Sequence, residues 1–553
     1  MDIAKVQKIL ATKAFHQPNH RFNDLYRYLK DECWLQSARF AILQNDGAKT
    51  PGVDGVVGKD LTEAEWQDII QQTITDFERG EYQPLPVARI YIPKANGIDM
   101  RPLGIPTIRD RMVQEVIRMV LEPIYESHFL PCSFGFRPNK STMDAVHGVQ
   151  LHMNNQIKQF WVIEGDIKGC FDNIPHKQLM HVLRKRIADE RLLSVIWSFL
   201  KAGYMEDDQC FTPNCGTPQG GICSPLLANI YLHEMDTYWF KHYGNLTAWQ
   251  KKQRRRKGMG NVTLVRYADD FLILTNGPKT EALALKEEFS QVLSELGLVL
   301  SPGKTLITHA NDGLDFLGFH IHRRPQRLHP ERKVIYITPT QRNVERYKDK
   351  LRAMLKSTQG DVVNKIRALN RVIRGWANYY RHVQSSHQRK TLEYWTYWAL
   401  WRWLRRKHDL GAKALYAHFT TQTPSGKRCL GYKGVYLVDM TRIRFEKYIA
   451  HPSLSPYLLE NSSLTIRDEQ PIALEVWDGM SSQNGYAIHR QDLLAIYGKH
   501  CQKCGKHELP GQLHTHHIVA RKDGGKDNLT NLILLCHDCH KETASYGRKR
   551  REI

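Results

Sequence analysis

Three aspartates lie in settings that suit divalent cation binding. Asp269 and Asp270 are adjacent in the apolar segment VTLVRYADDFLIL, whose β-prone residues predict a hairpin with both carboxylates at its tip. Asp166 follows a second apolar strand, Trp161 to Gly165. Adjacent carboxylates repel each other unless a cation joins them, and hard oxygen ligands suit Mg²⁺ better than zinc. Two such ions about 4 Å apart can activate a 3′-hydroxyl and stabilise a leaving pyrophosphate, so the pattern predicts nucleotidyl transfer.

Four cysteines near the C-terminus form two CxxC pairs, Cys501 with Cys504 and Cys536 with Cys539. Four thiolates in two such pairs predict a closed, tetrahedral, structural zinc site. Disulfides or free thiols are the alternative. The other seven cysteines show no pairing pattern, as expected where thiols stay reduced.

Histidines accompany the cysteine pairs. His516 and His517 lie between the pairs, Asn531 begins the segment NLILLC, and His540 directly follows Cys539. Because sulfur already satisfies a structural zinc ion, the histidines are free for other chemistry. The pKa of histidine, near neutrality, suits a general base. A zinc module that only binds DNA is the alternative.

Composition and periodicity indicate the elements that position these groups. Residues 85–321 alternate apolar runs, helical patterns and Gly or Pro residues, which predicts an α+β unit. Its clearest helix follows Asp110, and we expect Pro123 to disturb the end of that helix. A basic run from Lys251 to Lys257 predicts either a solvated loop or a contact with a phosphate backbone.

The charge balance predicts a polyanionic partner. The chain of 553 residues has 79 Lys and Arg against 57 Asp and Glu, a net charge of +22, which points first to nucleic acid. Residues 321–410 alone hold 22 basic and 6 acidic residues, and six of the ten residues from Tyr394 to Trp403 are aromatic. Helical spacing there predicts basic, aromatic-rich helices that contact RNA or DNA. A bundle whose charges are merely solvated is the alternative.

Membrane attachment is not expected. No apolar stretch approaches the roughly 18 residues of a membrane span, and the N-terminal segment lacks the apolar core of a secretory signal. We therefore expect a soluble protein of the bacterial cytoplasm or nucleoid, with an organelle as the alternative.

The order of motifs along the chain resembles that of group II intron reverse transcriptases. YADD at residues 267–270 is preceded by SFGFRPNKS from Ser133 and by PQGGICSPLLANIYL from Pro218, and FLGFHI follows from Phe316. The later helices, including RVIRGWANYYRHV, are similar to the thumb or maturase segment of the same family. The C-terminal Cys and His pattern resembles an HNH endonuclease.

This resemblance implies roles for the polymerase residues. Asp166, Ile167 and Asp269 would bind Mg²⁺, with Asp270 beside them in the catalytic set. Further residues would handle the nucleotide: Lys94 and Arg101 by holding the triphosphate, Phe171 by excluding a ribose 2′-hydroxyl, Gln219 by lining the nucleotide site, and Lys304 by protonating pyrophosphate.

The resemblance to HNH endonucleases implies roles for the C-terminal residues. His517 would be the general base that activates water, and Asn531 would orient it. His516 and His540 would bind a divalent ion, again Mg²⁺ by expectation. One departure is visible: Ala544 stands four residues after His540, where such nucleases often have a further ligand, so a water molecule would have to fill that place.

The implied fold class is an α+β multidomain protein with right-hand reverse transcriptase fingers and palm, an α-helical thumb (maturase domain X) and a small zinc-containing ββα HNH module. The expected domains are 1–84, an N-terminal extension and fingers; 85–321, fingers and palm; 322–412, thumb or maturase domain; 413–490, a DNA-binding or linker region; and 491–553, the HNH endonuclease.

The implied function is an intron-encoded protein that is reverse transcriptase, splicing maturase and target-DNA endonuclease in one chain, acting in intron mobility by target-primed reverse transcription. Expected partners are the intron RNA, target DNA and dNTPs, with a homodimer left open, and expected cofactors are Mg²⁺ and Zn²⁺. Two alternatives remain: a non-catalytic RNA-binding splicing chaperone, and a host-adopted reverse transcriptase in defence or repair.

Overall fold

The structure, a computed structural model of the whole chain, describes residues 2–93, 100–206, 209–211, 215–217, 220–423, 426, 428–451, 455–458, 493–494, 500–508, 512–517 and 532–543. The chain divides into two compact units. The first unit comprises residues 1–145, 163–307 and 450–553, and the second comprises 146–162 and 308–449. None of the helices in the described ranges is long and apolar enough to cross a lipid bilayer.

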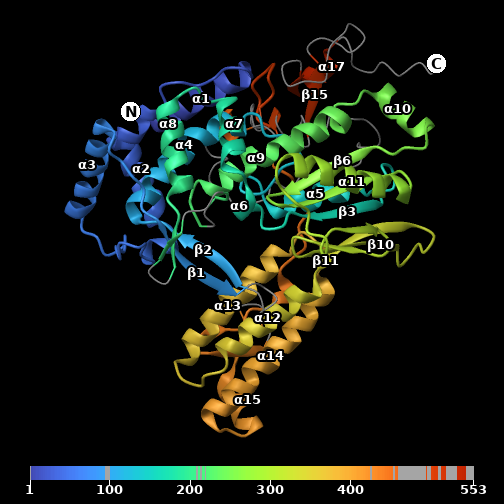
Figure 1. Cartoon of the computed structure of the whole chain (residues 1–553). Coiled ribbons are helices and arrows are strands. Elements are labelled where there is room, and N and C mark those ends of the chain that lie inside the picture. The colour runs from blue at the N-terminus through green and yellow to red at the C-terminus, as the bar shows by residue number, and fades with distance from the viewer. Residues whose placement is uncertain are drawn as a thin grey trace. The chain divides into compact units, whose positions relative to one another are not determined.

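The first unit is rich in helices (Figure 1). They are α1 (Ile3–His16), α2 (Glu32–Leu43), α3 (Glu63–Arg79), α4 (Ile108–Glu126), α6 (Cys170–Asn173), α7 (His176–Arg184), α8 (Glu190–Lys201), α9 (Ser224–Trp239), α10 (Ala248–Arg256) and α11 (Lys279–Glu295), with the short 3-10 helices η1 (Tyr26–Lys30), η2 (Asp46–Lys49) and η5 (Pro456–Leu458) and the π-helix η3 (Phe240–Gly244). Helix α4 is buried along nearly its whole length and contacts both α1 and α2. It is therefore the central helix of the group formed by α1, α2 and α4.

Helix α4 continues through Pro123 to Glu126, so the disturbed end that the sequence predicted is not found. Proline lacks the main-chain N–H that would bind the carbonyl of Met119, four residues earlier. The side-chain amide of Gln7, on α1, donates to that carbonyl at 2.9 Å. A tertiary contact therefore replaces the hydrogen bond that proline removes.

Two four-stranded sheets belong largely to the first unit, with orders β6-β7-β3-β8 and β2-β1-β4-β5. Their strands are β1 (Val87–Pro93), β2 (Met100–Ile105), β3 (Trp161–Asp166), β4 (Tyr204–Glu206), β5 (Gln209–Phe211), β6 (Val262–Tyr267), β7 (Asp270–Thr275) and β8 (Leu306–His309). Strands β6 and β7 pair antiparallel, with Tyr267 opposite Asp270. The predicted hairpin with Asp269 and Asp270 at its tip is confirmed.

The basic run at 251–257 is not a loop, because α10 spans Ala248–Arg256. The Thr247 side chain accepts from the N–H of Gln250, and the Gln250 side chain accepts from the N–H of Thr247. This capping box satisfies main-chain donors that a helix N-terminus otherwise leaves open. The solvated-loop interpretation of this run is therefore wrong.

The second unit combines a three-stranded sheet of order β11-β10-β9 with a group of helices. Its elements are α5 (Thr142–His152, shared with the first unit), β9 (Leu314–Phe316), β10 (Phe319–Pro325), β11 (Lys333–Pro339), α12 (Gln341–Met354), α13 (Val362–Tyr379), α14 (Ser386–His408), α15 (Ala412–Phe419), β12 (Thr420–Gln422), β13 (Arg428–Tyr432), β14 (Val435–Tyr436) and η4 (Met440–Arg442). One apolar core joins α12, α13 and α14 with α15, β13 and η4.

The C-terminal module has the expected ββα arrangement in its described residues. Strands β15 (Leu513–His517) and β16 (Leu532–Cys536) pair antiparallel, and α17 (His537–Lys541) follows directly. Its small core consists of leucines together with cysteine side chains.

Candidate functional site

The tip of the β6–β7 hairpin presents Asp269 and Asp270. Ala268, directly before them, has a left-handed φ of 58°, which the tight turn requires. Gly135, in the SFGF segment, lies so close that a Cβ there would overlap the main chain of Ala268. The SFGF segment therefore packs against the turn that carries the two carboxylates.

Arg266 holds this hairpin in place from inside the fold, where its side chain is 0% exposed. Its guanidinium donates to both carboxylate oxygens of Asp236 at 2.8 and 2.5 Å, to Asn229 Oδ1 at 2.9 Å and to Ser133 Oγ at 2.8 Å. Asn229 in turn donates to the carbonyl of Gly135 at 2.7 Å. Burial opposes ionisation of Asp236, but Arg266 holds the pKa of Asp236 at about 2. Three motifs distant in sequence thus meet at one buried ion pair.

Asp166 reaches the same region at the end of β3. A Cβ at Gly165 would overlap the aromatic ring of Phe271, so β3 and β7 can approach this closely only with glycine at that position. The main-chain carbonyl of Asp166 accepts from the N–H of Ser301 at 2.8 Å. Glycine at 165 is thus what allows Asp166 to lie near Asp269 and Asp270.

The three carboxylates affect one another's ionisation. Burial, together with the charges of Asp269 and Asp166, raises the pKa of Asp270 to about 6. Burial and Asp166 also raise the pKa of Asp269, whereas Arg101 and Lys304 act in the opposite direction on both groups. Lys304 Nζ lies 3.0 and 3.2 Å from the two carboxylate oxygens of Asp166. A divalent cation would relieve this repulsion, so the donor set fits Mg²⁺.

Phe171 lies on α6, directly after the strand that carries Asp166. The helix begins after Gly169, which has a left-handed φ of 52°. The carbonyl of Phe171 accepts from the N–H of Thr217 at 2.6 Å, and its half-buried ring lies edge-on to that of Phe136, with centroids 6.3 Å apart. These contacts fix the ring close to the strand that delivers Asp166.

Lys94 and Gln219 lie outside the described residues, but their neighbours Pro93 and Gly220 are described. Strand β1 ends at Pro93, and Arg101 pairs with Ile92 across the β1–β2 hairpin. Gly220 follows Gln219 with a φ of 111°, and a Cβ there would overlap the carbonyl of Gly104 on β2. Gly220 therefore lies directly against the β1–β2 hairpin.

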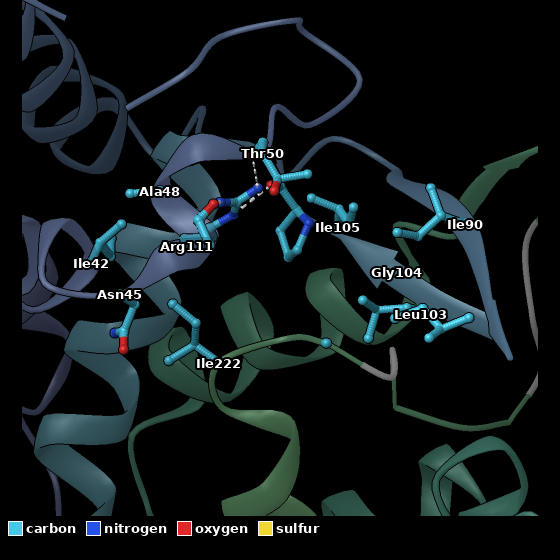
Figure 2. A pocket seen from close by; sticks show the side chains of 14 residues that line it. Ile42, Asn45, Ala48, Thr50, Ile90, Leu103, Gly104, Ile105, Arg111 and Ile222 are labelled. Carbon is cyan, nitrogen blue, oxygen red and sulfur yellow. Dashed lines mark hydrogen bonds between the residues drawn. The ribbon is translucent and has the colours of Figure 1, made fainter. Parts of the chain in front are cut away.

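A cavity of about 470 Å³ lies beside this contact (Figure 2). Apolar side chains form most of its wall, among them Ile42, Ile90, Leu103, Ile105 and Ile222. The guanidinium of Arg111, at one wall, donates to the carbonyls of Gly47 at 2.7 Å and Thr50 at 2.8 Å. Its donors are thus used by the protein itself, and the rest of the wall is largely apolar.

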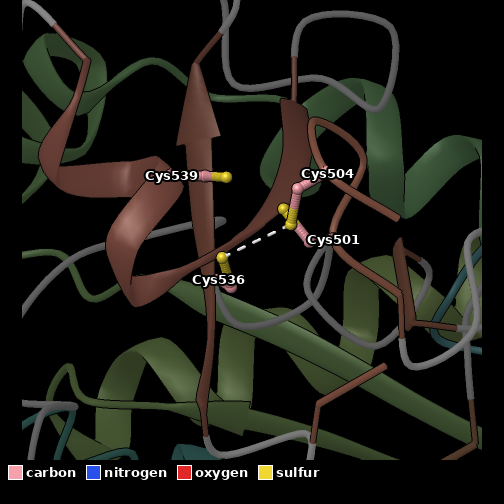
Figure 3. Close-up of side chains that lie close together, drawn as sticks. All are labelled: Cys501, Cys504, Cys536 and Cys539. Atoms are coloured by element: carbon pink, nitrogen blue, oxygen red, sulfur yellow. Dashed lines mark hydrogen bonds between the residues drawn. The ribbon is translucent and has the colours of Figure 1, made fainter. Parts of the chain in front are cut away.

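The four cysteines converge on one point from a loop, the end of β16 and α17 (Figure 3). All four sulfur atoms lie within 4.8 Å of one another, and Sγ of Cys504 is 3.8 Å from Sγ of Cys536. Tetrahedral zinc with Zn–S bonds of about 2.3 Å needs sulfur atoms about 3.8 Å apart. The geometry therefore fits zinc. Within the described ranges this is the only such tight group of metal-binding side chains, so the three aspartates are spaced more widely.

His516 and His540, which the resemblance to HNH endonucleases implies as ligands of one ion, lie close together. Their ring centroids are 5.5 Å apart. Burial lowers the pKa of both rings, helped by His517 for His516 and first by His514 for His540, so both are neutral near pH 7. Neutral imidazole is the form that binds metals. His517 follows His516 in β15 and, by the alternation of strand side chains, points to the opposite face.

His514 was not predicted from the sequence, yet it stacks on His540 with centroids 5.2 Å apart and planes 9° from parallel. It stands two residues before His516, so the period-two rule for strands could have placed both on one face. Arg266, Asp236 and Asn229 were not predicted either, because no local sequence signal marks them. Asn531 lies outside the described residues, as does Ala544.

Comparisons with known proteins give matches along most of the chain. Models of three families match consecutive parts of the chain: reverse transcriptase (RNA-dependent DNA polymerase) at residues 92–321, group II intron maturase-specific domain at 344–419, and HNH endonuclease at 501–545. The chain is also 38% identical over 360 residues to protein YkfC of Escherichia coli (strain K12), covering 62% of this chain and 94% of that protein. The chain belongs to the family of group II intron-encoded proteins.

Two further relatives of this group II intron-encoded protein come from a bacterium and a fungus. Group II intron-encoded protein LtrA of Lactococcus lactis subsp. cremoris is 37% identical over 349 residues, which are 55% of this chain and 57% of LtrA. An uncharacterized 91 kDa protein in the cob intron of Schizosaccharomyces pombe is 31% identical over 384 residues, 59% of this chain and 47% of that protein. The matched part thus spans about half the length of these two relatives.

The group II intron-encoded protein joins a reverse transcriptase, a maturase and an HNH DNA endonuclease in one polypeptide. Its reverse transcriptase and maturase domains imply binding of intron RNA and of DNA. Families of both enzymes usually use metal ions, and the four cysteines can bind zinc.

Proposed function

We propose that this group II intron-encoded protein copies its intron into DNA by target-primed reverse transcription, with Asp166, Asp269 and Asp270 as the polymerase carboxylates. The observation that carries the proposal is the meeting of these groups beside the cations Arg101 and Lys304, where burial, together with the charges of Asp269 and Asp166, raises the pKa of Asp270 to about 6. Clustered carboxylates that disfavour their own ionisation are the arrangement that bound dications stabilise.

The chain's residues then have distinct tasks. Asp166, Asp269 and Ile167, whose only oxygen is its main-chain carbonyl, would hold Mg²⁺, which when bound activates a 3′-hydroxyl and stabilises pyrophosphate. The nucleotide would be handled as follows: Arg101 and Lys94 hold the triphosphate, Phe171 excludes a 2′-hydroxyl, Gln219 lines the nucleotide site, and Lys304 gives a proton to pyrophosphate. Lys304 already contacts Asp166, which supports a place for it at the reacting end of the nucleotide.

The C-terminal module would nick the second DNA strand. His517 acts as general base, Asn531 orients it, and His516 and His540 bind the divalent ion that stabilises the phosphate transition state. The closeness of His516 to His540 supports this assignment. Zinc at the four cysteines has a structural task only.

The partners follow from these activities. The protein would bind unspliced intron RNA, stabilise the ribozyme fold for splicing, and carry the excised RNA to a DNA target, with dNTPs as polymerase substrates. The net charge of +22 supports action at the bacterial nucleoid or in the surrounding cytoplasm. A homodimer stays a prediction.

Primer extension on an RNA template with dNTPs and Mg²⁺ tests the polymerase. We expect synthesis by the parent protein and a loss of at least a thousandfold in Asp269→Asn, which removes one carboxylate charge and keeps the side-chain volume. The matched control is Asp312→Asn, at an exposed aspartate outside the cluster. Absence of synthesis by the parent would favour a splicing chaperone without catalysis, whereas equal synthesis by Asp269→Asn would show that this carboxylate is not needed for polymerisation.

A further inference from the structure

Helix α10 carries a basic face with an exposed aromatic ring, which none of the activities above uses. Trp249 is 68% exposed, and Lys252, Arg255 and Arg256 are also exposed. Residues three, six and seven positions after Trp249 lie on the same half of a helix. These four residues, termed the α10 patch, therefore form one surface.

The charges of the α10 patch would destabilise an isolated helix. Lys252 and Arg256 stand in i, i+4 positions, where like charges destabilise a helix, and Lys251 and Arg255 repeat the same relation. A helix of 9 residues is also too short to be stable alone in water. Other parts of the protein must therefore hold the patch in its helical form.

Arg254 provides that attachment, from the other side of α10. It donates to Glu281 at 2.9 Å and to the carbonyl of Gly260 at 3.0 Å, and its guanidinium lies 5.0 Å from the ring centre of Tyr243. The hydroxyl of Tyr243 is itself fixed by Glu288, at 2.7 and 2.8 Å. Arg254 thus has a structural task, while the patch faces away from this anchor.

We propose that the α10 patch binds an RNA segment that contains an unpaired base, with the base stacked on Trp249 and the phosphates on Lys252, Arg255 and Arg256. The inference rests on the proposed RNA-binding function and specifies a surface for it. A fixed, cationic and nearly anion-free helix is complementary to a phosphate backbone. An exposed indole needs an unstacked base, which loops and bulges of folded RNA supply and an intact DNA duplex does not.

A lipid surface fits the patch less well. A helix that lies in a membrane interface has a broad apolar face opposite its charges. On α10 the large apolar side chain is Trp249 alone, and cations flank it on the same face. Nucleic acid is therefore the partner that the patch favours.

The test uses the full chain and three labelled probes: an RNA hairpin with a single-stranded loop, the same RNA fully paired, and a DNA hairpin of the same sequence. Dissociation constants are measured by fluorescence anisotropy between 50 and 300 mM salt, that is, over roughly the range in which counterion release is resolved. We expect Trp249→Ala to weaken binding of the RNA loop about tenfold, to leave the paired RNA unchanged, and to be rescued by Trp249→Phe.

Removal of the charges should act differently. The triple variant Lys252→Gln, Arg255→Gln and Arg256→Gln should make the slope of log K against log salt shallower by about 2, since each phosphate contact on a single strand contributes about 0.7. The matched control loses three exposed cations elsewhere in the first unit: Lys30→Gln, Lys59→Gln and Arg79→Gln. Equal effects of the control, equal losses on paired RNA, or preference for the DNA hairpin would overturn the proposal.

Primer extension on an oligo(dT)-primed poly(rA) template separates this proposal from the proposed function. We expect every α10 variant to polymerise like the parent. If these variants polymerise normally and also keep full affinity for the RNA loop, the α10 proposal fails and the polymerase stands. If the parent itself does not polymerise, the proposed function fails whatever the hairpin affinities are.

Discussion

Arg266 connects three sequence motifs of the polymerase through its hydrogen bonds. It directly precedes the YADD turn, pairs with Asp236 in the last turn of α9, and reaches the SFGF segment through Ser133. The pair is ionised although it is fully buried, and such a pair stabilises a fold only if its remaining donors and acceptors are satisfied. Asn229 and the carbonyl of Ala268 meet that condition.

Asp236→Ala should therefore lower the free energy of unfolding by about 3–5 kcal/mol, because it leaves the Arg266 charge buried without its partner. Asp236→Asn should cost less, since it keeps one acceptor. Urea unfolding of the full chain, followed by tryptophan fluorescence, measures both. Asp68→Ala, at an exposed aspartate on α3, is the control and should change stability by less than about 0.5 kcal/mol. A small effect of Asp236→Ala would mean that the pair does not hold the hairpin.

Gly165→Ala should reduce polymerase activity and destabilise the chain by about 1–3 kcal/mol. The new methyl group overlaps the ring of Phe271, so β3 must move away from β7 and take Asp166 with it. Gly375→Ala, within α13, is the matched change, since a Cβ there meets no atom within 4 Å. That control should be neutral or slightly stabilising. Primer extension and thermal melting of both variants decide the point, and equal activities would contradict the assigned close approach.

At the scale of elements, the sequence predicts what is encoded locally and misses what depends on distant partners. The β6–β7 hairpin was predictable, because its alternating apolar residues and its turn lie within one short segment. The persistence of α4 through Pro123 was not, since Gln7 lies more than a hundred positions away. Helix α10 was also missed, because a run of cations gives no apolar period and its anchor, Glu281, is remote.

The junction of α1 with the end of α4 should make stability depend on pH. Burial and Arg186 lower the pKa of His128 to about 4, and an Arg186 N–H donates to its Nε2 at 2.7 Å. An unfolded chain binds this proton near pH 6.5, so between about pH 6.5 and 4 it holds more protons than the folded chain. The free energy of unfolding should therefore fall as pH falls through that window, with no contribution from His128 above it.

His128→Gln tests this junction, because glutamine is uncharged at every pH in the window. Urea unfolding of the parent and the variant between pH 4.5 and 7.5, roughly the window of the shift, gives the two pH dependences. We expect the slope of the variant to be shallower by up to one proton. Matching slopes would show that the proton is taken up elsewhere. His329→Gln, at an exposed histidine, should leave the slope unchanged.

For the whole molecule, motif order along the sequence was enough to predict which enzymes the chain combines, but not how its late segments attach. Residues 413–490 gave no chemical motif, yet His451 donates from its N–H and binds through Nδ1 to Asp144, both at 2.8 Å. Tyr457 donates to Glu122 at 3.1 Å. These partners are 307 and 335 positions apart in the sequence, beyond any periodicity that a single sequence reveals.

Zinc removal should abolish the nuclease activity and leave the polymerase activity intact. The C-terminal module has a small core in which buried Cys501, Cys536 and Cys539 pack with leucines, so it depends on metal to stay folded. A zinc chelator, or Cys536→Ser, should abolish nicking of target DNA, while primer extension with added Mg²⁺ should persist. Zinc content by mass spectrometry should fall from one ion per chain to none. Persistent nicking by a zinc-free protein would contradict a structural zinc.

A substitution in one catalytic centre should abolish that centre's activity and leave the activity of the other centre unchanged within one intact ribonucleoprotein. Asp269→Asn should lose cDNA synthesis yet still nick target DNA and support splicing, because under the proposed function the intron RNA would supply the splicing chemistry. His517→Ala should splice and extend a supplied primer yet lose nicking. Splicing, nicking and cDNA are measured on the same preparation, with Asp312→Asn and His329→Gln as controls. If Asp269→Asn also abolished splicing, the carboxylates would be needed for RNA binding as well as synthesis. If nicking survived in His517→Ala, another residue, with His514 the nearest choice to His540, would have to activate water.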